Sequence, residues 1–142
     1  MVQNPPEGTP RLSPYLLVED VDSELDWLVS TLGFSDSGRM KGPDRRSIHG
    51  AVRMGEALVM MGCPGPEYKN PKHRGGATVL TYIYVDDVDA HHAKARQNGA
   101  DTASDPADQF YGDRTYSVED PEGHQWVFSQ HTRDVAPEDM HP

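Results

Sequence analysis

The sequence predicts an α+β fold of two βαβββ modules that form a curled, mixed-sheet cup. The main evidence is an internal repeat, because Tyr-Leu-Leu-Val-Glu-Asp-Val-Asp at 15–22 returns as Tyr-Ile-Tyr-Val-Asp-Asp-Val-Asp at 82–89, 67 positions later. Each copy runs from apolar residues through an acidic turn into a helix-like stretch that ends at Gly33 or Gly99, and a hairpin pattern follows. A repeat this long exceeds a solenoid unit. It predicts two copies of one half-domain, with function in the cleft between them.

The elements of the first half follow in order from residue 12. An apolar strand is expected first, and Asp20 or Asp22 then caps a helix to about Leu32, where Gly33 stops it. A second strand starts at Phe34, and a hairpin turns at Gly55-Glu56. The expected segments are strand Leu12–Val18, helix to Leu32, strand Phe34–Arg39, and strands Ser47–Met54 and Ala57–Met61.

The second half repeats this order after a connector rich in Pro and Gly. β-branched and aromatic residues predict a strand at Thr78–Val85, and Asp87 or Asp89 caps the helix that follows. Asp120-Pro121-Glu122-Gly123 has the composition of a structural turn. The expected segments are strand Thr78–Val85, helix Ala90–Asn98, a short strand near Asp101–Ala103, a loop at 105–113, and strands Arg114–Val118 and Gln125–Ser129.

A length of 142 residues predicts one domain with a real core. We expect a flexible leader at 1–11, a single domain over 12–131 and a loose tail at 132–142. Within the domain, the first half covers about 12–61, the connector 62–77 and the second half 78–131.

Composition narrows the classes of partner. The net charge of −10 argues against nucleic acid and anionic membranes, because phosphate binding needs clustered Lys and Arg. The same charge favours a cationic ligand, although solubility is the simpler explanation. No apolar run approaches the roughly 20 residues of a membrane helix, and residues 1–10 do not resemble a signal peptide. With Cys63 as the single cysteine, a reducing cytoplasmic location is the default expectation.

Two motifs near the C-terminus carry a family resemblance. Tyr111-Gly112-Asp113-Arg114 precedes Val118-Glu119-Asp120-Pro121-Glu122-Gly123-His124-Gln125-Trp126, and Val85-Asp86-Asp87-Val88-Asp89-Ala90 and Gly99-Ala100 belong to the same pattern. This resembles the vicinal oxygen chelate superfamily of glyoxalase I, extradiol dioxygenases, fosfomycin-resistance enzymes and bleomycin-resistance proteins, and most of all its PhnB-like and bleomycin-resistance-like branch. The resemblance covers about 12–131 and implies a homodimer, with antibiotic resistance as one role. It specifies the fold better than the reaction.

The resemblance also implies where metal ligands would stand, on the first and last strands of each half. Counting from the shared motifs puts Ser13, Met60, Leu80 and Val127 at those positions. These side chains do not offer the nitrogen and oxygen donors that Mg²⁺, Mn²⁺, Zn²⁺ or Fe²⁺ need, so neither a metal nor another cofactor is expected. Of the seven His, the adjacent His91 and His92 are interpreted as surface residues, and His49 is the best candidate to reach the cleft.

Without a metal, the expected cavity has aromatic and apolar walls that bind flat or cationic groups. Several of these residues have a structural alternative: Trp126 packs under a helix if strand alternation places Val127 toward the cleft, and Arg114 pins its loop if it pairs with Asp113, Glu119 or Asp120. No residue is expected to be catalytic. The candidate ligand-binding residues are His49, Met60, Tyr82, Phe110, Tyr111, Arg114, Tyr116 and Trp126.

Three functions remain open from the sequence. The first is a metal-free protein that binds a small organic molecule, cationic or aromatic, in the cleft between the modules. The second is an enzyme of the same fold, a lyase, isomerase or dioxygenase whose metal ligands have moved. The third is a dimeric domain with a regulatory or structural role.

Overall fold

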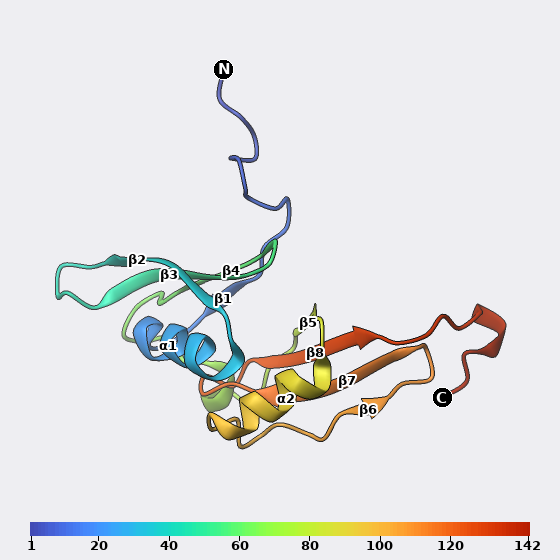
Figure 1. Cartoon of the computed structure of the whole chain (residues 1–142). Helices are drawn as coiled ribbons and strands as arrows, with labels where there is room; N and C mark the ends of the chain where they lie inside the picture. The colour runs from blue at the N-terminus through green and yellow to red at the C-terminus, as the bar shows by residue number, and fades with distance from the viewer.

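The computed structural model describes all 142 residues and contains the two expected βαβββ halves in sequence (Figure 1). The α+β class and the two-module architecture are therefore confirmed. The first half consists of β1 (Tyr15–Leu17), α1 (Val21–Leu32), β2 (Ser35–Lys41), β3 (Ser47–Met54) and β4 (Ala57–Gly62). The second consists of β5 (Leu80–Tyr84), α2 (Val88–Gln97), β6 (Ala107–Asp108), β7 (Asp113–Glu119) and β8 (Gln125–His131). Two short 3₁₀ turns lie outside the halves, at Pro71–His73 and Pro137–Asp139.

Each half forms one four-stranded sheet with the same topology. The strand order is β1-β4-β3-β2 in the first sheet and β5-β8-β7-β6 in the second. In both sheets the first strand pairs in parallel with the last, and the remaining pairs are antiparallel. The first strand therefore stays at one edge of each sheet, and the sheets do not close on each other.

The sixth strand lies later in the chain than the sequence predicts. The expected strand at 101–103 is absent, and β6 pairs with β7 from Ala107, opposite Thr115. At Thr102 the side-chain hydroxyl, and not the backbone, makes the hydrogen bonds to the β7 backbone, so no strand forms there. The hydroxyl donates to the Glu119 carbonyl at 2.8 Å and accepts from the Glu119 amide at 2.9 Å.

The two helices begin with the same cap. Asp20 accepts a hydrogen bond from the Ser23 amide, and Asp87 accepts one from the Ala90 amide, each at 3.0 Å. Of the alternatives left by the sequence, Asp20 and Asp87 are thus the N-caps. Gly33 ends α1 with φ of 81°, a conformation that glycine adopts without a steric penalty.

A single hydrophobic core joins the halves. Its cluster of 17 buried residues includes Leu25 and Leu28 of α1 together with Trp126 and Phe128 of β8. Phe34 meets Trp126 across the boundary, with ring centroids 5.5 Å apart. Because the helical faces of both sheets share this core, the two halves are packed as one body.

His91 also links the halves, contrary to the surface position expected from the sequence. Its Nε2 is 2.8 Å from the Leu32 carbonyl at the end of α1, and its Nδ1 is 2.6 Å from the Tyr116 hydroxyl. The carbonyl must accept from Nε2–H. Burial lowers the pKa of His91, which favours the neutral ring, and in that ring Nδ1 accepts from the Tyr116 hydroxyl.

The turn at 120–123 docks the second half onto the start of α1. The buried Glu122 carboxylate accepts from the amides of Glu19 and Asp20 and from the Asn70 side chain, at 2.7 to 3.1 Å. Gly123 lies so close to the chain at Lys72 that an added Cβ would be 2.5 Å from its amide nitrogen. The turn therefore has the structural role that its sequence predicts.

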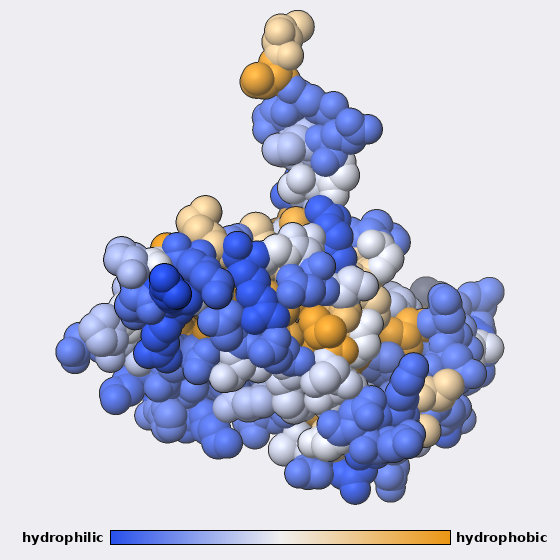
Figure 2. Space-filling view, turned by 60° about the vertical axis from the view of Figure 1, so that its left-hand side comes forward, coloured by the Kyte–Doolittle hydropathy of each residue, from blue (hydrophilic) through white to orange (hydrophobic).

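The N-terminal segment leaves the body as an extended arm, and the arm carries an apolar tip (Figure 2). At its base, Arg53 donates to the Gly8 carbonyl at 3.0 Å, while Leu12 is 85% exposed. Most of the surface in this view is hydrophilic, with an apolar area in the middle of the face below the arm. None of the helices combines the length and the apolar composition needed to cross a membrane.

Candidate functional site

The candidate site lies on the sheet faces turned away from the helices, called here the open faces. Alternation along the strands decides which side chains point there. In β1, Leu16 enters the core while Tyr15 and Leu17 remain 48% and 43% exposed. In β5, Ile83 packs against the core while Tyr82 and Tyr84 remain 39% and 59% exposed. Large apolar rings thus stay accessible on both open faces.

On the first open face, Tyr15 pairs with His49. The Tyr15 hydroxyl lies 2.9 Å from His49 Nδ1, and the two ring centroids are 5.6 Å apart. Met60 stands directly opposite Tyr15 on β4. Gly62 makes the arrangement possible, because an added Cβ there would be 2.5 Å from the Tyr15 hydroxyl. The ring of Tyr15 therefore lies over Gly62 to reach His49.

On the second open face, a buried carboxylate gathers the side chains. Oδ2 of Asp113 accepts from the hydroxyls of Tyr82 at 2.7 Å, Tyr84 at 2.9 Å and Ser129 at 3.0 Å. Asp113 itself is only 4% exposed. The rings of Tyr82 and Tyr84 meet edge to face, with centroids 5.6 Å apart. One carboxylate thus orients two accessible aromatic rings.

The other oxygen of Asp113 pairs with His131. His131 Nδ1 lies 2.8 Å from Asp113 Oδ1, and its Nε2 lies 2.8 Å from Asp134 Oδ1. Both ring nitrogens therefore face carboxylate oxygens, which accept but do not donate. Asp134, and next Asp113, accordingly raise the pKa of His131. The arrangement favours the doubly protonated ring.

The same contacts set the charge of Asp113. Its burial would raise the carboxyl pKa, but the hydrogen bonds from Tyr82, His131, Tyr84 and Ser129 outweigh burial and lower it to about 2. In turn, burial and the contact with Asp113 raise the pKa of Tyr82. At neutral pH the cluster therefore consists of an ionised carboxylate and protonated phenols.

A cleft of about 860 Å³ lies beside these tyrosines and is lined by residues of both halves. Tyr82 and Tyr84 form part of one wall, and Leu58 of β4 with Leu12 and Pro14 of the N-terminal segment form part of another. Its charged lining residues are Glu56 from the first half and Asp86 from the second. The cleft is thus apolar and aromatic, with only negative charge among its lining side chains.

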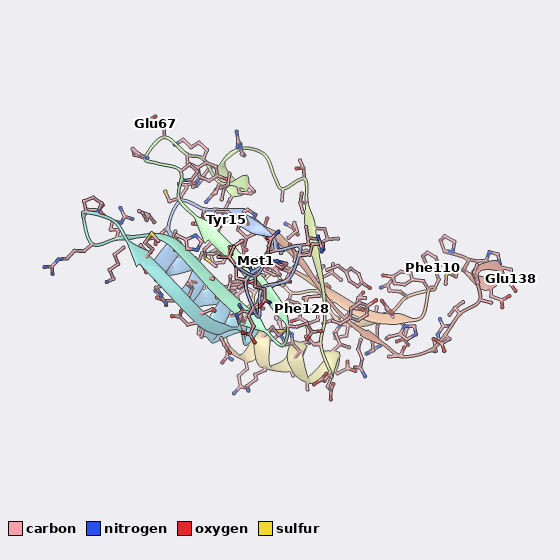
Figure 3. All side chains as sticks on the ribbon, turned by 90° about the horizontal axis from the view of Figure 1, so that it is seen from above. Met1, Tyr15, Glu67, Phe110, Phe128 and Glu138 are labelled. Carbon is pink, nitrogen blue, oxygen red and sulfur yellow. The ribbon has the colours of Figure 1, made fainter.

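The loop residues Phe110 and Tyr111 reach this cluster from its outer side. The Tyr111 hydroxyl lies 3.4 Å from that of Tyr82, and Phe110 packs edge to face on Tyr111 with centroids 5.2 Å apart. Phe110 sits at the outer end of the second half, far from Tyr15 (Figure 3). The structure thus brings Tyr82 and Tyr111 together but keeps Phe110 away from the Tyr15–His49 pair.

Three expected ligand-binding residues point to the helical side of the second sheet instead. Trp126 and Tyr116 are 0% and 1% exposed and belong to the core, which matches the structural alternative given by strand alternation for Trp126. Arg114 binds Asp89 of α2 and Asp108 of β6. The alternation that puts Asp113 and Ser129 on the open face sends Arg114, Tyr116 and Trp126 to the helical face.

The family positions for metal ligands do not fit a divalent ion. Ser13 precedes β1 with its Oγ buried and without a hydrogen-bond partner, and Met60, Leu80 and Val127 supply a thioether and two hydrocarbon side chains. No group of three or more His, Cys, Asp and Glu side chains elsewhere is arranged to hold a metal ion. The donor set at these positions lacks the nitrogen and oxygen ligands that such ions prefer.

Sequence reasoning missed the residues that organise the second open face. Asp113 and Ser129 lie on the same face of the sheet as Val127, the position that the family resemblance places toward the cleft. Strand alternation applied from Val127 therefore predicts that both side chains point to the open face. Glu24 was also missed. It is fully buried in α1 and neither of its oxygens has a hydrogen-bond partner, and its spacing from Val21 and Leu28 signals the buried face.

The chain is similar to known proteins in sequence and in structure. A relative from Mycobacterium tuberculosis (strain ATCC 25618 / H37Rv), itself uncharacterised, is 37% identical over 131 residues, which cover 89% of this chain and 77% of the relative. TioX from Micromonospora sp. ML1 has a TM-score of 0.71 at 30% identity, over 86% of this chain and 98% of TioX. The bleomycin-binding protein of Streptomyces verticillus, solved with copper(II)-bleomycin, has a TM-score of 0.60 at 25% identity, over 90% of this chain and 97% of that protein.

The family itself follows from a match that spans both halves. The model of the Glyoxalase/Bleomycin resistance protein/Dioxygenase superfamily matches residues 11–128, which include every strand of the two sheets up to Phe128. The repeated βαβββ topology and the open faces agree with that match. The chain belongs to the glyoxalase/bleomycin resistance protein/dioxygenase superfamily.

Proposed function

We propose that this protein binds a small organic molecule non-covalently in the cleft between its halves, without a metal ion. The observation that carries the proposal is the pair of accessible rings, Tyr82 and Tyr84, on the wall of the 860 Å³ cleft. Exposed aromatic rings that a buried carboxylate holds in place suit a flat guest. The bleomycin-binding relative shows that a protein of this fold can serve as a binder.

The affinity would come mainly from apolar burial and ring contacts. Burial contributes roughly 25 cal/mol per Å² of apolar surface. An aromatic pair adds about 0.5–1.5 kcal/mol beyond the buried area. Asp113 already orients the rings of Tyr82 and Tyr84 in the free protein. These side chains therefore lose little conformational entropy when a guest binds. The cleft needs no catalytic residue to do this.

We also propose that the protein acts as a homodimer. Apolar side chains on the open faces remain accessible in the single chain, including Tyr15, Leu17, Leu80 and Tyr84. A second copy over these faces would cover apolar surface and enclose the guest. Sedimentation of the full chain at micromolar concentration tests this, and a species near 15.8 kDa would contradict it.

The binding proposal is tested by a thermal-shift and calorimetry screen. The probes are bleomycin-like glycopeptides, planar aromatic cations and small carbonyl compounds. A hit is then repeated with Tyr82→Ala and with Tyr68→Ala, a matched loss of a ring that lies outside the cleft. We expect Tyr82→Ala to weaken binding and Tyr68→Ala to leave it near the wild-type value.

The same screen distinguishes an enzyme. Turnover of a hemithioacetal or a catechol by the purified protein would replace the binding proposal with a lyase or dioxygenase function. Binding that is unaffected by Tyr82→Ala would move the site away from this cleft. No binding by any probe class at millimolar concentration would contradict the proposal.

A further inference from the structure

We propose that Tyr82 and Tyr84, held by the buried carboxylate of Asp113, form a subsite for the cationic, hydrogen-bond-donating end of the guest. The chemical class is a planar amidinium, guanidinium or aryl ammonium group. Asp113 is the positioning residue of this subsite, since it acts on the guest through the two phenols. The inference rests on the proposed function and specifies the chemistry of its ligand.

The phenol protons of Tyr82 and Tyr84 point at the Asp113 carboxylate. A tyrosine hydroxyl has one proton to donate, and an ionised carboxylate can only accept. Both hydroxyls are within 2.9 Å of Asp113 Oδ2, so both of their protons are directed at Asp113. The phenol oxygens therefore have only lone pairs to offer, and that of Tyr82 also lies 3.0 Å from the Ser129 hydroxyl and 3.4 Å from the Tyr111 hydroxyl. A group that merely accepts hydrogen bonds finds no partner there, whereas an N–H donor finds a free acceptor at Tyr84 and one at Tyr82 that it shares with these neighbours.

The contact with Asp113 strengthens the two phenol oxygens as hydrogen-bond acceptors. A hydroxyl that donates to a charged acceptor becomes polarised, and its oxygen accepts more strongly. Part of the Asp113 charge is thus transmitted to the oxygens of Tyr82 and Tyr84, although Asp113 itself is only 4% exposed. The edge-to-face contact of the two rings, with centroids 5.6 Å apart, fixes both oxygens relative to each other.

The charged side chains that line the cleft are all negative. Glu56 and Asp86 come from opposite halves, and they are the charged side chains that line the cleft. No Lys, Arg or His is among the lining residues. The ring faces of Tyr82 and Tyr84 attract cations as well. Acceptor oxygens, ring faces and lining carboxylates therefore all favour a guest of positive charge.

The anchoring role is measured first, in the ligand-free protein. Tyrosine labelled with ¹³C at Cζ gives NMR signals that report the hydroxyl hydrogen bonds, and Tyr82→Phe and Tyr84→Phe assign two of the six signals. We expect Asp113→Asn to shift the Tyr82 and Tyr84 signals together. Asp108→Asn is the matched control, because Asp108 lies in the same half but contacts Arg114 and neither tyrosine. It should leave both signals in place.

The ligand class is measured with three planar probes of one shape: benzamidine, benzamide and benzoate. We expect the Tyr82 and Tyr84 signals to report binding in that order, with benzamidine preferred over benzoate by about tenfold or more, as charge-assisted hydrogen bonds imply. Tyr84→Phe keeps the ring and removes an acceptor oxygen, so it should reduce this preference even if Asp113→Asn fails to fold. Asp108→Asn should retain the preference.

Several results would overturn the inference. One is binding of benzoate that equals or exceeds that of benzamidine. A second is a preference for benzamidine over benzoate that survives in both Tyr84→Phe and Asp113→Asn. A third is that benzamidine at tens of millimolar shifts neither tyrosine signal. Its failure is distinguishable from failure of the proposed function. A guest from the wider screen whose binding is weakened by Tyr82→Ala, but which is bound without any preference for positive charge, would keep the binding function and remove this subsite.

Discussion

Tyr15 and Tyr82 occupy equivalent positions in the two sheets. Each lies on the edge strand of its sheet, Tyr15 opposite Met60 and Tyr82 opposite Val127 on the parallel neighbour. Each hydroxyl reaches over the residue two positions further along that neighbour, which is Gly62 in the first half and Ser129 in the second. The repeat thus preserves the tyrosine, while its partner is an imidazole in one half and a carboxylate in the other.

Gly62→Ala should disrupt the Tyr15–His49 contact without unfolding the protein. The new Cβ would lie 2.5 Å from the Tyr15 hydroxyl oxygen and 3.1 Å from Cε1 of the ring. Because the ring is rigid, it must move as a whole. Nitrogen-15 NMR of His49 measures the change, and we expect the Nδ1 signal to shift as the contact with the Tyr15 hydroxyl is lost. The control is Ala107→Gly on β6, which lies in the second half and pairs with β7. It should leave the His49 signals in place.

Tyr116→Ala should destabilise the fold and should not act as a selective ligand-binding defect. The ring is 1% exposed, stacks on Phe128 at 5.5 Å and bonds to His91. Removal of a buried aromatic ring costs about 3–5 kcal/mol through lost burial and the cavity left behind. Urea unfolding checks this, with Tyr116→Phe as the control that keeps the ring. A Tyr116→Ala protein of wild-type stability would show that the ring is not part of the core.

Much of the fold is predictable because its signals are local or repeated. Asp20, Asp87 and Gly33 carry cap chemistry in their own residue types, and the 67-residue repeat implies that the halves share one topology. The site is harder to predict, because strand parity decides which face a side chain takes and an error of one residue reverses it. Arg114, Tyr116 and Trp126 were expected at the cleft but point to the helical face, whereas Asp113, which precedes Arg114 in the chain, points to the open face.

Long-range partners were the second source of error. β6 lies at 107–108 because Thr102 binds the backbone of Glu119, a contact between residues distant in sequence. His91 is held by Leu32 and Tyr116 from other elements, so its own helix pattern gives no sign of burial. Such contacts depend on how the halves pack and are not visible in any single segment.

His131→Asn should lower stability more at acidic than at alkaline pH. Asp134 and Asp113 raise the pKa of His131 in the folded protein, so folding favours the protonated ring. This stabilisation is fully present below the unfolded-state pKa near 6.5 and is lost as pH rises through the folded-state value. Thermal unfolding of both proteins from pH 5.5 to 9 tests it. A gap in Tm that is constant over this range would contradict a charge-based contact.

Glu24→Gln should stabilise the protein, and increasingly so as the pH rises. Burial, and next the nearby charge of Asp120 and of Glu122, raise the pKa of Glu24 far above the ordinary value of 4.5, so the folded protein keeps this side chain protonated. The unfolded chain loses the proton above pH 4.5, which favours unfolding by about 1.4 kcal/mol for each further pH unit until the folded-state pKa is reached. Glutamine resembles the protonated acid in shape and has no proton to lose.

The measurement is the free energy of unfolding in urea at intervals from pH 5.5 to 8.5, for the wild type, Glu24→Gln and Glu67→Gln. Other groups that titrate in this range, His131 among them, affect all three proteins alike, so the difference between variant and wild type isolates Glu24. Glu67 is exposed in the connector and should show no such difference. If the Glu24→Gln gain did not grow with pH, the buried carboxyl would have to be ionised in the folded state, with a partner that its two unbonded oxygens lack in the structure.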